Sequence, residues 1–397
     1  MSGDLPDSRT ARATVLAGLG TVGTETVALG RADGRYLAQP VRAGLDAPPF
    51  DAAAMDGWAV RSADLSRSDG LVAAGETTAG GSPPAPLRPG EAHRIFTGAP
   101  LPPGADRVVE QERAAISGDR VRFAGMSDRR HVRVRGADFT RGQELLPGGA
   151  RLDGWNLGLL AAAGLDAVTV MRRPRVALVT MGDELVAPGT PLPPGASYDS
   201  NGPALTASTE GWGGEVVDRH RLRDDAAALS AAVAASDADL IVVVGGASVG
   251  RRDVAKPALL SIGLDLLVPG VAMRPGKPTW SGRLPDGRPV LGLPGNPAAA
   301  LVAATLFLRP ILAAMQGGDP SIRLRRAALV SPLAPAGAWE HWLRARATDD
   351  GVVALDDQDT SFVTRLAAAD LLIRRASRAP AAEAGSAVET LALDRLR

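Results

Sequence analysis

Hydrophobic and polar positions follow three different patterns along the chain. Between about residues 40 and 150, apolar residues come in short runs such as Arg107-Val108-Val109 and Val121-Arg122-Phe123, with Gly and Pro between them. Short apolar runs separated by turn residues are typical of strands joined by tight connections. This zone is therefore predicted to be a β-rich module.

The second zone, residues 172–316, alternates strand-like and helix-like stretches. The predicted strands are 176–180, 215–217, 240–244 and 290–293, and the predicted helices are 204–210, 224–235 and 297–315. Such alternation favours a parallel sheet with helices on both faces. After Gly317-Gly318 and Pro320 the chain returns to short strand-like runs, which predict a small C-terminal β domain.

Length and composition fit a soluble protein of several domains. The 397 residues exceed what one core organises, so about two to four domains are expected. No run reaches membrane-spanning length without Gly, Pro or a charge, and the first twelve residues hold no apolar core of a signal peptide. The expected location is the cytoplasm, with no membrane partner.

The numbers of cysteine, histidine and charged residues limit which metal sites, nucleophiles and partners the protein could have. The chain has no cysteine, and its four histidines lie far apart, so thiolate sites and a cysteine nucleophile are excluded and a metal would use oxygen ligands, as Mg²⁺ prefers. The 44 basic and 44 acidic residues cancel, and no aromatic-basic stripe occurs, so nucleic acid is not an expected partner. Lys256 and Lys277 are the only lysines.

The segment from Pro48-Pro49 to Ala59 displays one carboxylate, Asp56, before Gly57-Trp58. The prolines predict an extended entry, and Asp56-Gly57 permits a backbone with positive φ. Two interpretations follow from these residues. Asp56 is either a ligand or proton-handling group on a shaped loop, or part of a turn between two surface strands.

Three further loops follow the predicted strands at 176–180, 240–244 and 290–293, where ligands gather in an open parallel sheet. The first of them contains Gly182-Asp183-Glu184. After the strand at 290–293, Asn296 suits a helix N-cap and Pro297 the first turn, so the helix that follows could hold an anion. The loop from Gly245 to Gly250 offers backbone N–H groups and Ser248 to an oxyanion. Plain turns are the alternative, and the missing Gly-Lys-Ser/Thr ending argues against ATP or GTP hydrolysis.

Two cations stand three residues apart in Met273-Arg274-Pro275-Gly276-Lys277-Pro278. Alone, such a turn is usually solvated surface. Beside four acids the segment predicts a site where cations grip phosphate or oxyanion and carboxylates hold Mg²⁺; the acids are Asp183, Glu184, Asp199 and Asp253.

A glycine pattern near the N-terminus raises a different possibility, dinucleotide binding. Residues 18–23 match G-x-G-x-x-G, the signature of dinucleotide binding. Only residues 14–17 could form the strand before it, and residues 24–29 look extended, not helical. Dinucleotide binding is therefore not favoured.

Taken together, these segments resemble the molybdopterin molybdenumtransferase (molybdenum insertase, MoeA) family, whose relatives include a domain of gephyrin. The matching motifs occur in the family's order, and they are Pro49-Phe50, Ala54-Met55-Asp56-Gly57-Trp58-Ala59, Thr97-Gly98-Ala99-Pro100-Leu101-Pro102, Gly104-Ala105-Asp106, Gly182-Asp183-Glu184-Leu185, Tyr198-Asp199-Ser200-Asn201, Gly245-Gly246 through Asp253, Pro275-Gly276-Lys277-Pro278 and Leu293-Pro294-Gly295-Asn296-Pro297.

The resemblance implies an α/β plus β fold in an elongated, multidomain homodimer. It implies a three-layer α/β pterin-nucleotide domain (1–22 and 174–318), a linking domain (23–42 and 140–173), an inserted β-rich domain (43–139) and a C-terminal β-barrel (319–397). In the family the active site lies between subunits. The Asp56 and Thr97 loops would then face the α/β loops of the partner chain.

The implied reaction uses adenylylated molybdopterin, molybdate and Mg²⁺, and yields molybdenum cofactor and AMP. The resemblance and the residue types assign catalysis to Asp56, Thr97, Glu184, Asp253 and Lys277, with Asp56, Glu184 and Asp253 placing the metal. The implied substrate-binding residues are Gly182, Asp183, Asp199, Ser200, Asn201, Gly245, Gly246, Ser248, Arg274, Pro275, Gly276, Pro294, Gly295, Asn296 and Pro297.

The chain departs from the family pattern at a few positions. Arg274 stands where the family usually has Lys, and Arg cannot give up a proton. Asp359-Thr360-Ser361 replaces a Gly-Ser-Gly segment, and Arg251-Arg252 makes its loop more basic. Two other functions stay open: adenylyl transfer to molybdopterin, and a dimeric scaffold of the same family without chemistry. Other proteins of molybdenum cofactor biosynthesis are further candidate partners.

Overall fold

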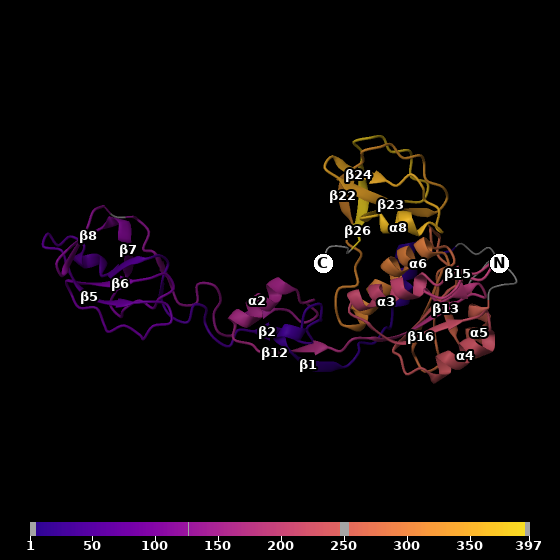
Figure 1. Ribbon diagram of the computed structural model, residues 1–397, viewed down its shortest axis with the longest axis horizontal. Helices are drawn as coiled ribbons and strands as arrows, with labels where there is room; N and C mark the ends of the chain where they lie inside the picture. The colour runs from indigo at the N-terminus through magenta and orange to yellow at the C-terminus, as the bar shows by residue number, and fades with distance from the viewer. Residues whose placement is uncertain (1–4, 126, 247–253, 394–397) are drawn as a thin grey trace.

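The computed structural model describes residues 5–125, 127–246 and 254–393, and its shape is elongated (Figure 1). Three six-stranded sheets occur among these residues. One lies at the far end of the molecule and is here called the distal sheet. A narrow middle part joins it to the α/β sheet and the C-terminal sheet, which lie together at the other end (Figure 1).

The α/β sheet has four neighbouring parallel strands, and two more strands are added to it by antiparallel pairing, so that only β20 runs in the opposite direction. In spatial order they are β16 (Glu215–Leu222), β13 (Arg175–Met181), β17 (Leu240–Val244), β21 (Pro289–Leu293), β20 (Trp280–Arg283) and β18 (Asp265–Val268). The predicted strands all exist, and β17 has the predicted bounds. Every residue of β17 is buried, as expected of a central parallel strand.

Helices cover both faces of this sheet. Leu240 and Val242 pack in one cluster, and Ile241 and Val243 in another, because alternate residues of a strand point to opposite faces. The helices are α1 (Ser8–Leu16), α3 (Asn201–Gly211), α4 (Ala226–Ala235), α5 (Ala255–Ser261), α6 (Pro297–Ala303) and α7 (Arg309–Met315). The predicted helix 224–235 begins only at Ala226, because Asp225 accepts the N–H groups of Ala227 and Ala228 as its N-cap.

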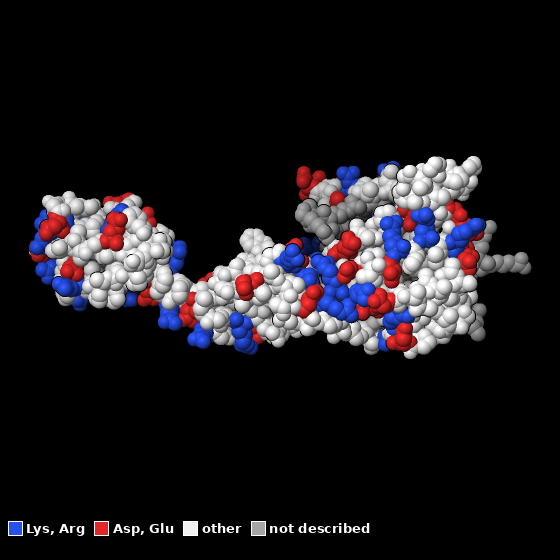
Figure 2. All heavy atoms as spheres, turned by 60° about the horizontal axis from the view of Figure 1, so that its bottom comes forward, with Lys and Arg blue, Asp and Glu red and all other residues white. Residues whose placement is uncertain are grey.

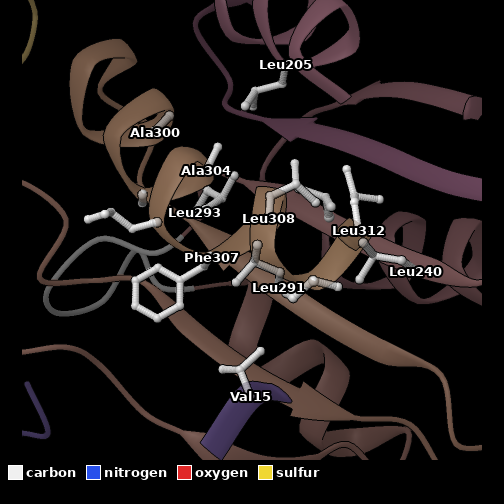
Figure 3. Close-up of a cluster of buried hydrophobic side chains, with 14 of the residues drawn as sticks. Val15, Leu205, Leu240, Leu291, Leu293, Ala300, Ala304, Phe307, Leu308 and Leu312 are labelled. Atoms are coloured by element: carbon white, nitrogen blue, oxygen red, sulfur yellow. The ribbon is translucent and has the colours of Figure 1, made fainter. Parts of the chain in front are cut away.

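The segment Pro297–Met315 runs through α6, a π-helical turn at Ala304–Leu308 and α7, and it forms the centre of the core. Ala300, Ala304 and Leu308 face strand residues such as Leu291 and Leu293 (Figure 3). Among the described residues this helix is the one stretch long and apolar enough to cross a membrane. Its most apolar 18 residues are 83% buried within the protein. Its apolar composition is that of a core helix.

The N-terminal glycine pattern follows a helix. Residues 14–16 belong to α1, so the strand considered at 14–17 is wrong. The extended segment expected after the pattern is confirmed as β1 (Thr24–Ala28). A strand, turn and helix in that order would be needed for dinucleotide binding, and this segment has the reverse order.

The narrow middle part is made of two pairs of strands from distant parts of the chain. β1 pairs with β12 (Ala167–Met171), and β2 (Val41–Arg42) pairs with β11 (Glu144–Leu146), while α2 (Gly154–Ala162) packs beside them. Where β12 meets the α/β sheet, Arg172 binds the carboxylate of Asp239 through two hydrogen bonds of 2.6 and 2.7 Å. Figure 2 shows basic and acidic side chains gathered together near this junction.

The distal sheet has the order β7-β4-β6-β5-β9-β8. Its strands are β7 (Arg107–Glu110), β4 (Gly57–Val60), β6 (Glu91–Ile95), β5 (Leu71–Thr77), β9 (Arg120–Phe123) and β8 (Ala114–Ser117). Beside it, β3 (Ala52–Ala53) pairs with β10 (Val132–Arg133). The predicted β-rich character of this zone is confirmed.

Gly57 does not serve the purpose expected from sequence. Its φ is not positive, and the residue opens the buried strand β4 and does not lie in a turn between surface strands. A Cβ atom on Gly57 would collide with the carbonyl of Val109 on β7. Glycine is required here because two strands approach closely.

The C-terminal sheet takes one strand from the α/β part. Its order is β19-β23-β25-β26-β22, with β24 beside β23. The strands are β19 (Met273–Arg274), β23 (Glu340–Thr348), β25 (Leu371–Arg375), β26 (Ala387–Ala392), β22 (Arg325–Ala328) and β24 (Gly351–Ala354), and α8 (Val363–Ala367) lies beside them. An isolated bridge joins Leu329 to Val352. Closure into a barrel and the four domain boundaries stay predictions.

We predict that Gly57→Ala loosens the distal sheet and leaves the α/β sheet intact. The added Cβ must push β4 away from β7, at a cost of about 1–3 kcal/mol. Hydrogen exchange of the β4 and β7 amides measures the effect directly. Gly30→Ala is the matched control, since an added Cβ meets no atom within 4 Å there. Unchanged protection in Gly57→Ala would show that the close approach is not a constraint.

Candidate functional site

Asp56 and Thr97 form a hydrogen-bonded pair at the edge of the distal sheet. The Oδ1 atom of Asp56 accepts hydrogen bonds from the backbone N–H and the hydroxyl of Thr97, each at 2.8 Å. Gly98 donates its N–H to the carbonyl of Ala53, and Ala53 donates to Ala99, so the two loops are fixed side by side. Oδ2 of Asp56 has no hydrogen bond among the described residues.

The pair keeps the carboxylate of Asp56 charged. The backbone N–H of Thr97, then its hydroxyl, lower the pKa of Asp56, and the charge of Arg94 adds a smaller effect. Arg94 itself is held between two rings, 5.7 Å from that of Trp58 and 5.1 Å from that of Phe96. The result is a preorganised, ionised acid beside a hydroxyl.

Gly182, Asp183 and Glu184 follow β13 at the carboxyl edge of the α/β sheet. Asp183 accepts a 3.0 Å hydrogen bond from Arg223. The carboxylate of Glu184 lies over Gly182, where a Cβ atom would come within 2.7 Å of it. Both acids are exposed. Gly182 therefore leaves the space that the Glu184 carboxylate occupies.

Asp199, Ser200 and Asn201 lead into α3 after the short pair β14 (Leu185–Val186) and β15 (Ser197–Tyr198). The carboxylate of Asp199 is buried and accepts bonds from the Thr180 hydroxyl and the Gly202 N–H. Its contacts fix the start of α3, where Ser200 occupies the N-cap position without a capping side-chain bond.

A pocket opens beside the start of α3. It has a volume of about 550 Å³ and lies against Asp199, with basic and small residues around it: Ala187, Pro188, Pro203, Arg219 and Arg221. Sequence reasoning did not single out the two arginines, because the strand predicted here covers only residues 215–217 and both arginines lie beyond its end.

Two loops of the predicted site meet behind Asn201. Its amide donates to the carbonyl of Gly295 at 2.6 Å, while its Oδ1 is buried without a partner. Gly295, which follows the buried Pro294, lies next to Gly245, since a Cβ on it would stand 3.5 Å from the Gly245 Cα. The 199–201, 245–246 and 294–297 segments therefore converge at one edge of the sheet.

The Gly245 loop differs in part from its expected role. Gly245 donates its N–H to Leu293, so this amide is engaged and not open to an oxyanion. Gly246 has a positive φ of 61°, and its carbonyl accepts from Val254. Ser248 and Asp253 lie outside the described residues, so their predicted roles stay predictions.

Asn296 does not cap its helix with its side chain. It occupies the N-cap position before Pro297, but its amide donates to the Thr360 hydroxyl at 2.8 Å. The N–H of Ala298 donates to the Thr360 carbonyl. A residue from the C-terminal part thus covers the start of α6 and takes up one of the amides that sequence reasoning offered to an anion.

The loop with the two cations is attached to the C-terminal sheet. Arg274 is paired with His341 in the β19–β23 ladder, and Pro275-Gly276 turns the chain toward Lys277. Arg274 and Lys277 are both exposed, and Nζ of Lys277 lies 4.6 Å from the centroid of the Trp339 ring. Lys277 therefore lies between β19 of the C-terminal sheet and β20 of the α/β sheet. The region around Arg274, Lys277 and the facing strand β23 is here called the seam.

Arg344 is a residue of this seam that sequence reasoning missed. It is buried in β23, and its Nε and Nη1 atoms have no partner, while Nη2 donates to the Asp357 carbonyl at 3.3 Å. Burial lowers the pKa of Arg344, and nearby Asp357 and Asp359 act in the opposite direction. A clue existed in the sequence, because Arg344 interrupts the apolar run of Trp342-Leu343 and Ala345.

His341 stays uncharged in this cluster. Burial, followed by the charges of Arg274 and Arg344, lowers its pKa from the ordinary value of 6.5. At neutral pH the seam therefore carries the positive charges of Arg274, Lys277 and Arg344 around a neutral ring. Such a group attracts an anion.

The predicted site residues fall into two groups. The seam and the edge of the α/β sheet bring together the segments around Glu184, Asn201, Lys277 and Asn296, whereas Asp56 and Thr97 lie in the distal part of the chain (Figure 1). Within the described ranges no three His, Asp or Glu residues gather as a metal site. One chain does not bring Asp56 beside Glu184.

Comparisons with known proteins match both parts of the chain. The model for the MoeA N-terminal region (domain I and II) matches residues 7–164, and the model for a probable molybdopterin binding domain matches residues 177–314. A protein named molybdopterin molybdenumtransferase from Nostoc sp. is 40% identical over 305 residues, which cover 74% of this chain and 70% of that relative.

Two further matches extend the likeness. Molybdopterin molybdenumtransferase 2 of Mycobacterium tuberculosis is 38% identical over 321 residues, covering 77% of this chain and 78% of the relative. A solved molybdopterin biosynthesis MoeA protein from Pyrococcus horikosii has a TM-score of 0.79 at 30% identity, covering 98% of this chain and 99% of that one. The mixed α/β fold is therefore shared along the whole chain.

We predict that Thr97→Val raises the pKa of Asp56 without restoring its ordinary value. The substitution removes the hydroxyl donor and keeps the backbone N–H, which has the larger effect. Carboxyl ¹³C NMR titration measures the shift. Thr97→Ser, which keeps the hydroxyl, should match the unaltered protein. An Asp56 pKa that is the same in Thr97→Val would mean that the hydroxyl bond does not hold the charge.

Proposed function

Because the chain belongs to the molybdopterin molybdenumtransferase family, we propose that it inserts molybdate into adenylylated molybdopterin in a Mg²⁺-dependent reaction that releases AMP. The protein is a transferase of molybdenum cofactor biosynthesis, as its relatives are named. The adenylylated form of the substrate and the metal requirement are parts of the proposal.

The cationic seam is the observation that carries this proposal. Molybdate is a dianion, and the pterin nucleotide carries phosphate. Arg274 and Arg344, both in strands of the C-terminal sheet, and Lys277, in the loop that leads into β20, offer positive charge. The hydroxyl of Thr360, which accepts a hydrogen bond from Asn296, adds a hydrogen-bonding group. Guanidinium groups bind such oxyanions through paired N–H donors, and a buried one with two unpaired nitrogen atoms, such as Arg344, has the most to gain from an anion.

The two arginines keep a fixed charge during the reaction. Arg cannot release a proton near neutral pH, so Arg274 and Arg344 act by binding and orienting anionic oxygens. Lys277 is the seam cation whose ammonium could exchange a proton. The Glu184 carboxylate, lying over Gly182, stands ready to accept a proton or a metal at the same edge of the sheet.

The carboxylates of Asp56 and Glu184 suit Mg²⁺ in type but lie far apart in one chain. Oδ2 of Asp56 has no hydrogen bond among the described residues, and Glu184 is exposed, so each could supply an oxygen ligand. Asp253 is the third proposed ligand. When bound, Mg²⁺ would neutralise charge on phosphate oxygens, and Asp56 would have to come from a second chain.

A homodimer with a composite site follows from this requirement. We propose that Asp56 and Thr97 of one protomer face the seam and the Glu184 edge of its partner. The predicted four-domain layout supports such an arrangement, because the narrow middle part holds the distal sheet away from its own seam (Figure 1). The Leu329–Val352 bridge supports the predicted closure of the C-terminal sheet into a barrel.

The reaction is tested by supplying adenylylated molybdopterin, Mg²⁺ and molybdate, and measuring AMP and molybdenum cofactor. We expect AMP release that depends on molybdate. Release without molybdate dependence would contradict the proposal, and ATP-dependent formation of the nucleotide would identify an adenylyltransferase instead. A protein that forms dimers and shows neither activity would be a scaffold.

We predict that Asp56→Asn lowers turnover by about 100-fold or more, which is the usual range for losing a positioned acid or base, while the dimer persists. Asp119→Asn, on an exposed hairpin of the same sheet, is the matched control and should keep normal turnover. Size-exclusion chromatography with light scattering follows the dimer. Near-normal turnover of Asp56→Asn would make the Asp56–Thr97 pair architectural.

A further inference from the structure

We propose that Trp339 is a positioning residue for Lys277, whose ammonium it holds by its aromatic face. Nζ of Lys277 lies 4.6 Å from the ring centroid, inside the range in which a cation is attracted by the ring quadrupole. The catalytic part of this inference rests on the proposed function, whereas the contact itself does not.

Hydrogen bonds and the conformation of Gly276 fix the backbone around Lys277, independently of the Lys277 side chain. Val271 donates to the Lys277 carbonyl at 3.0 Å, and Thr279 donates to Gly276 at 2.9 Å. Gly276 has a φ of 110°, and a Cβ on it would collide with Met273. The remaining freedom lies in the long, flexible side chain, whose direction the Trp339 ring sets.

Trp339 is itself anchored by the pairing of β23 with β19, the strand that comes from the α/β part of the chain. The residue after it, Glu340, donates its N–H to Ala272 at 3.2 Å and begins the β19–β23 ladder. The ring is 39% exposed, so it is a platform at the surface of the seam and not a core side chain. A cation from the α/β part and a ring from the C-terminal part therefore meet because two backbone strands are paired.

An aromatic holder leaves the charge of Lys277 available. In the described part of the chain Lys277 makes no ion pair, so no carboxylate neutralises it. A ring face orders the ammonium without accepting its N–H groups as an oxygen would, and those donors stay free for an oxyanion. A carboxylate in the place of Trp339 would compete with the anion.

The contact can be observed directly because the chain has only two lysines. Reductive ¹³C-methylation labels Lys256, Lys277 and the amino terminus, and it keeps the positive charge of each lysine. We expect the Lys277 methyl signal, assigned by its loss in Lys277→Arg, to be shifted upfield by the ring. Trp339→Leu should return it to the position of an exposed lysine and leave the Lys256 signal in place.

Two outcomes of this NMR measurement decide whether the Lys277–Trp339 contact exists. A Lys277 signal that is the same in Trp339→Leu and in the unaltered protein would overturn it. Trp339→Phe keeps a smaller ring and should retain part of the shift, which separates a ring effect from a general disturbance of the loop. Circular dichroism and the thermal midpoint check that the folded state is kept, as expected for a partly exposed residue.

Kinetics then test the positioning role. Loss of an exposed cation–π contact corresponds to about a 2- to 5-fold change, so Trp339→Leu should lower kcat/KM for molybdate-dependent AMP release by that factor, with Trp339→Phe restoring most of it. An unchanged kcat/KM despite a lost NMR shift would overturn the role in the reaction. If the unaltered protein releases no AMP, the proposed function fails, and the NMR result still decides the contact.

Discussion

The separation that the narrow middle part keeps between the distal sheet and the seam is the constraint on which the rest of this structure depends. Two strand pairs, β1–β12 and β2–β11, run through that part, and the bidentate Arg172–Asp239 bond fixes its junction with the α/β sheet. The Asp56–Thr97 pair is therefore held at one end of the chain and the cations at the other (Figure 1). The proposed dimer, in which a second copy of the chain supplies Asp56, would complete the site.

The seam owes its charge to the pairing of two strands that come from different parts of the chain. β19 belongs by sequence to the α/β part, yet it extends the C-terminal sheet through β23. That pairing places Arg274 beside His341 and brings Arg344 and Trp339 to the same region. Burial keeps His341 neutral and leaves two nitrogen atoms of Arg344 without partners. Such unsatisfied donors cost stability in the absence of an anion, which is typical of a binding site.

Sequence reasoning predicted the parts of the molecule that depend on local pattern. The apolar run of β17 and the strand–helix alternation have one structural solution, because each buried strand needs a helix on both faces. The motifs also located the Asp56 loop and the cationic turn. The pairing of Asp56 with Thr97 could be expected only from the resemblance, since 41 residues separate the two side chains.

The features that sequence reasoning missed depend on contacts between distant segments. Asn296 has the right chemistry for a cap, but Thr360 provides a partner 64 residues away. Gly57 is explained by the carbonyl of Val109 on a neighbouring strand, not by its own φ. Arg344 comes close to the cationic turn only because β23 pairs with β19. The hydrophobic periodicity along the chain does not predict these contacts, because they form only when strands from distant segments assemble into sheets.

Complementation between two inactive variants tests the composite site most directly. Asp56→Asn and Lys277→Ala would be unfolded together, refolded as a mixture and assayed for molybdate-dependent AMP release. If each site uses Asp56 of one protomer and Lys277 of the other, half of the dimers are mixed and each has one intact site, so about a quarter of the normal activity returns. If both residues act within one chain, the mixture stays as inactive as either variant alone, and the account is wrong.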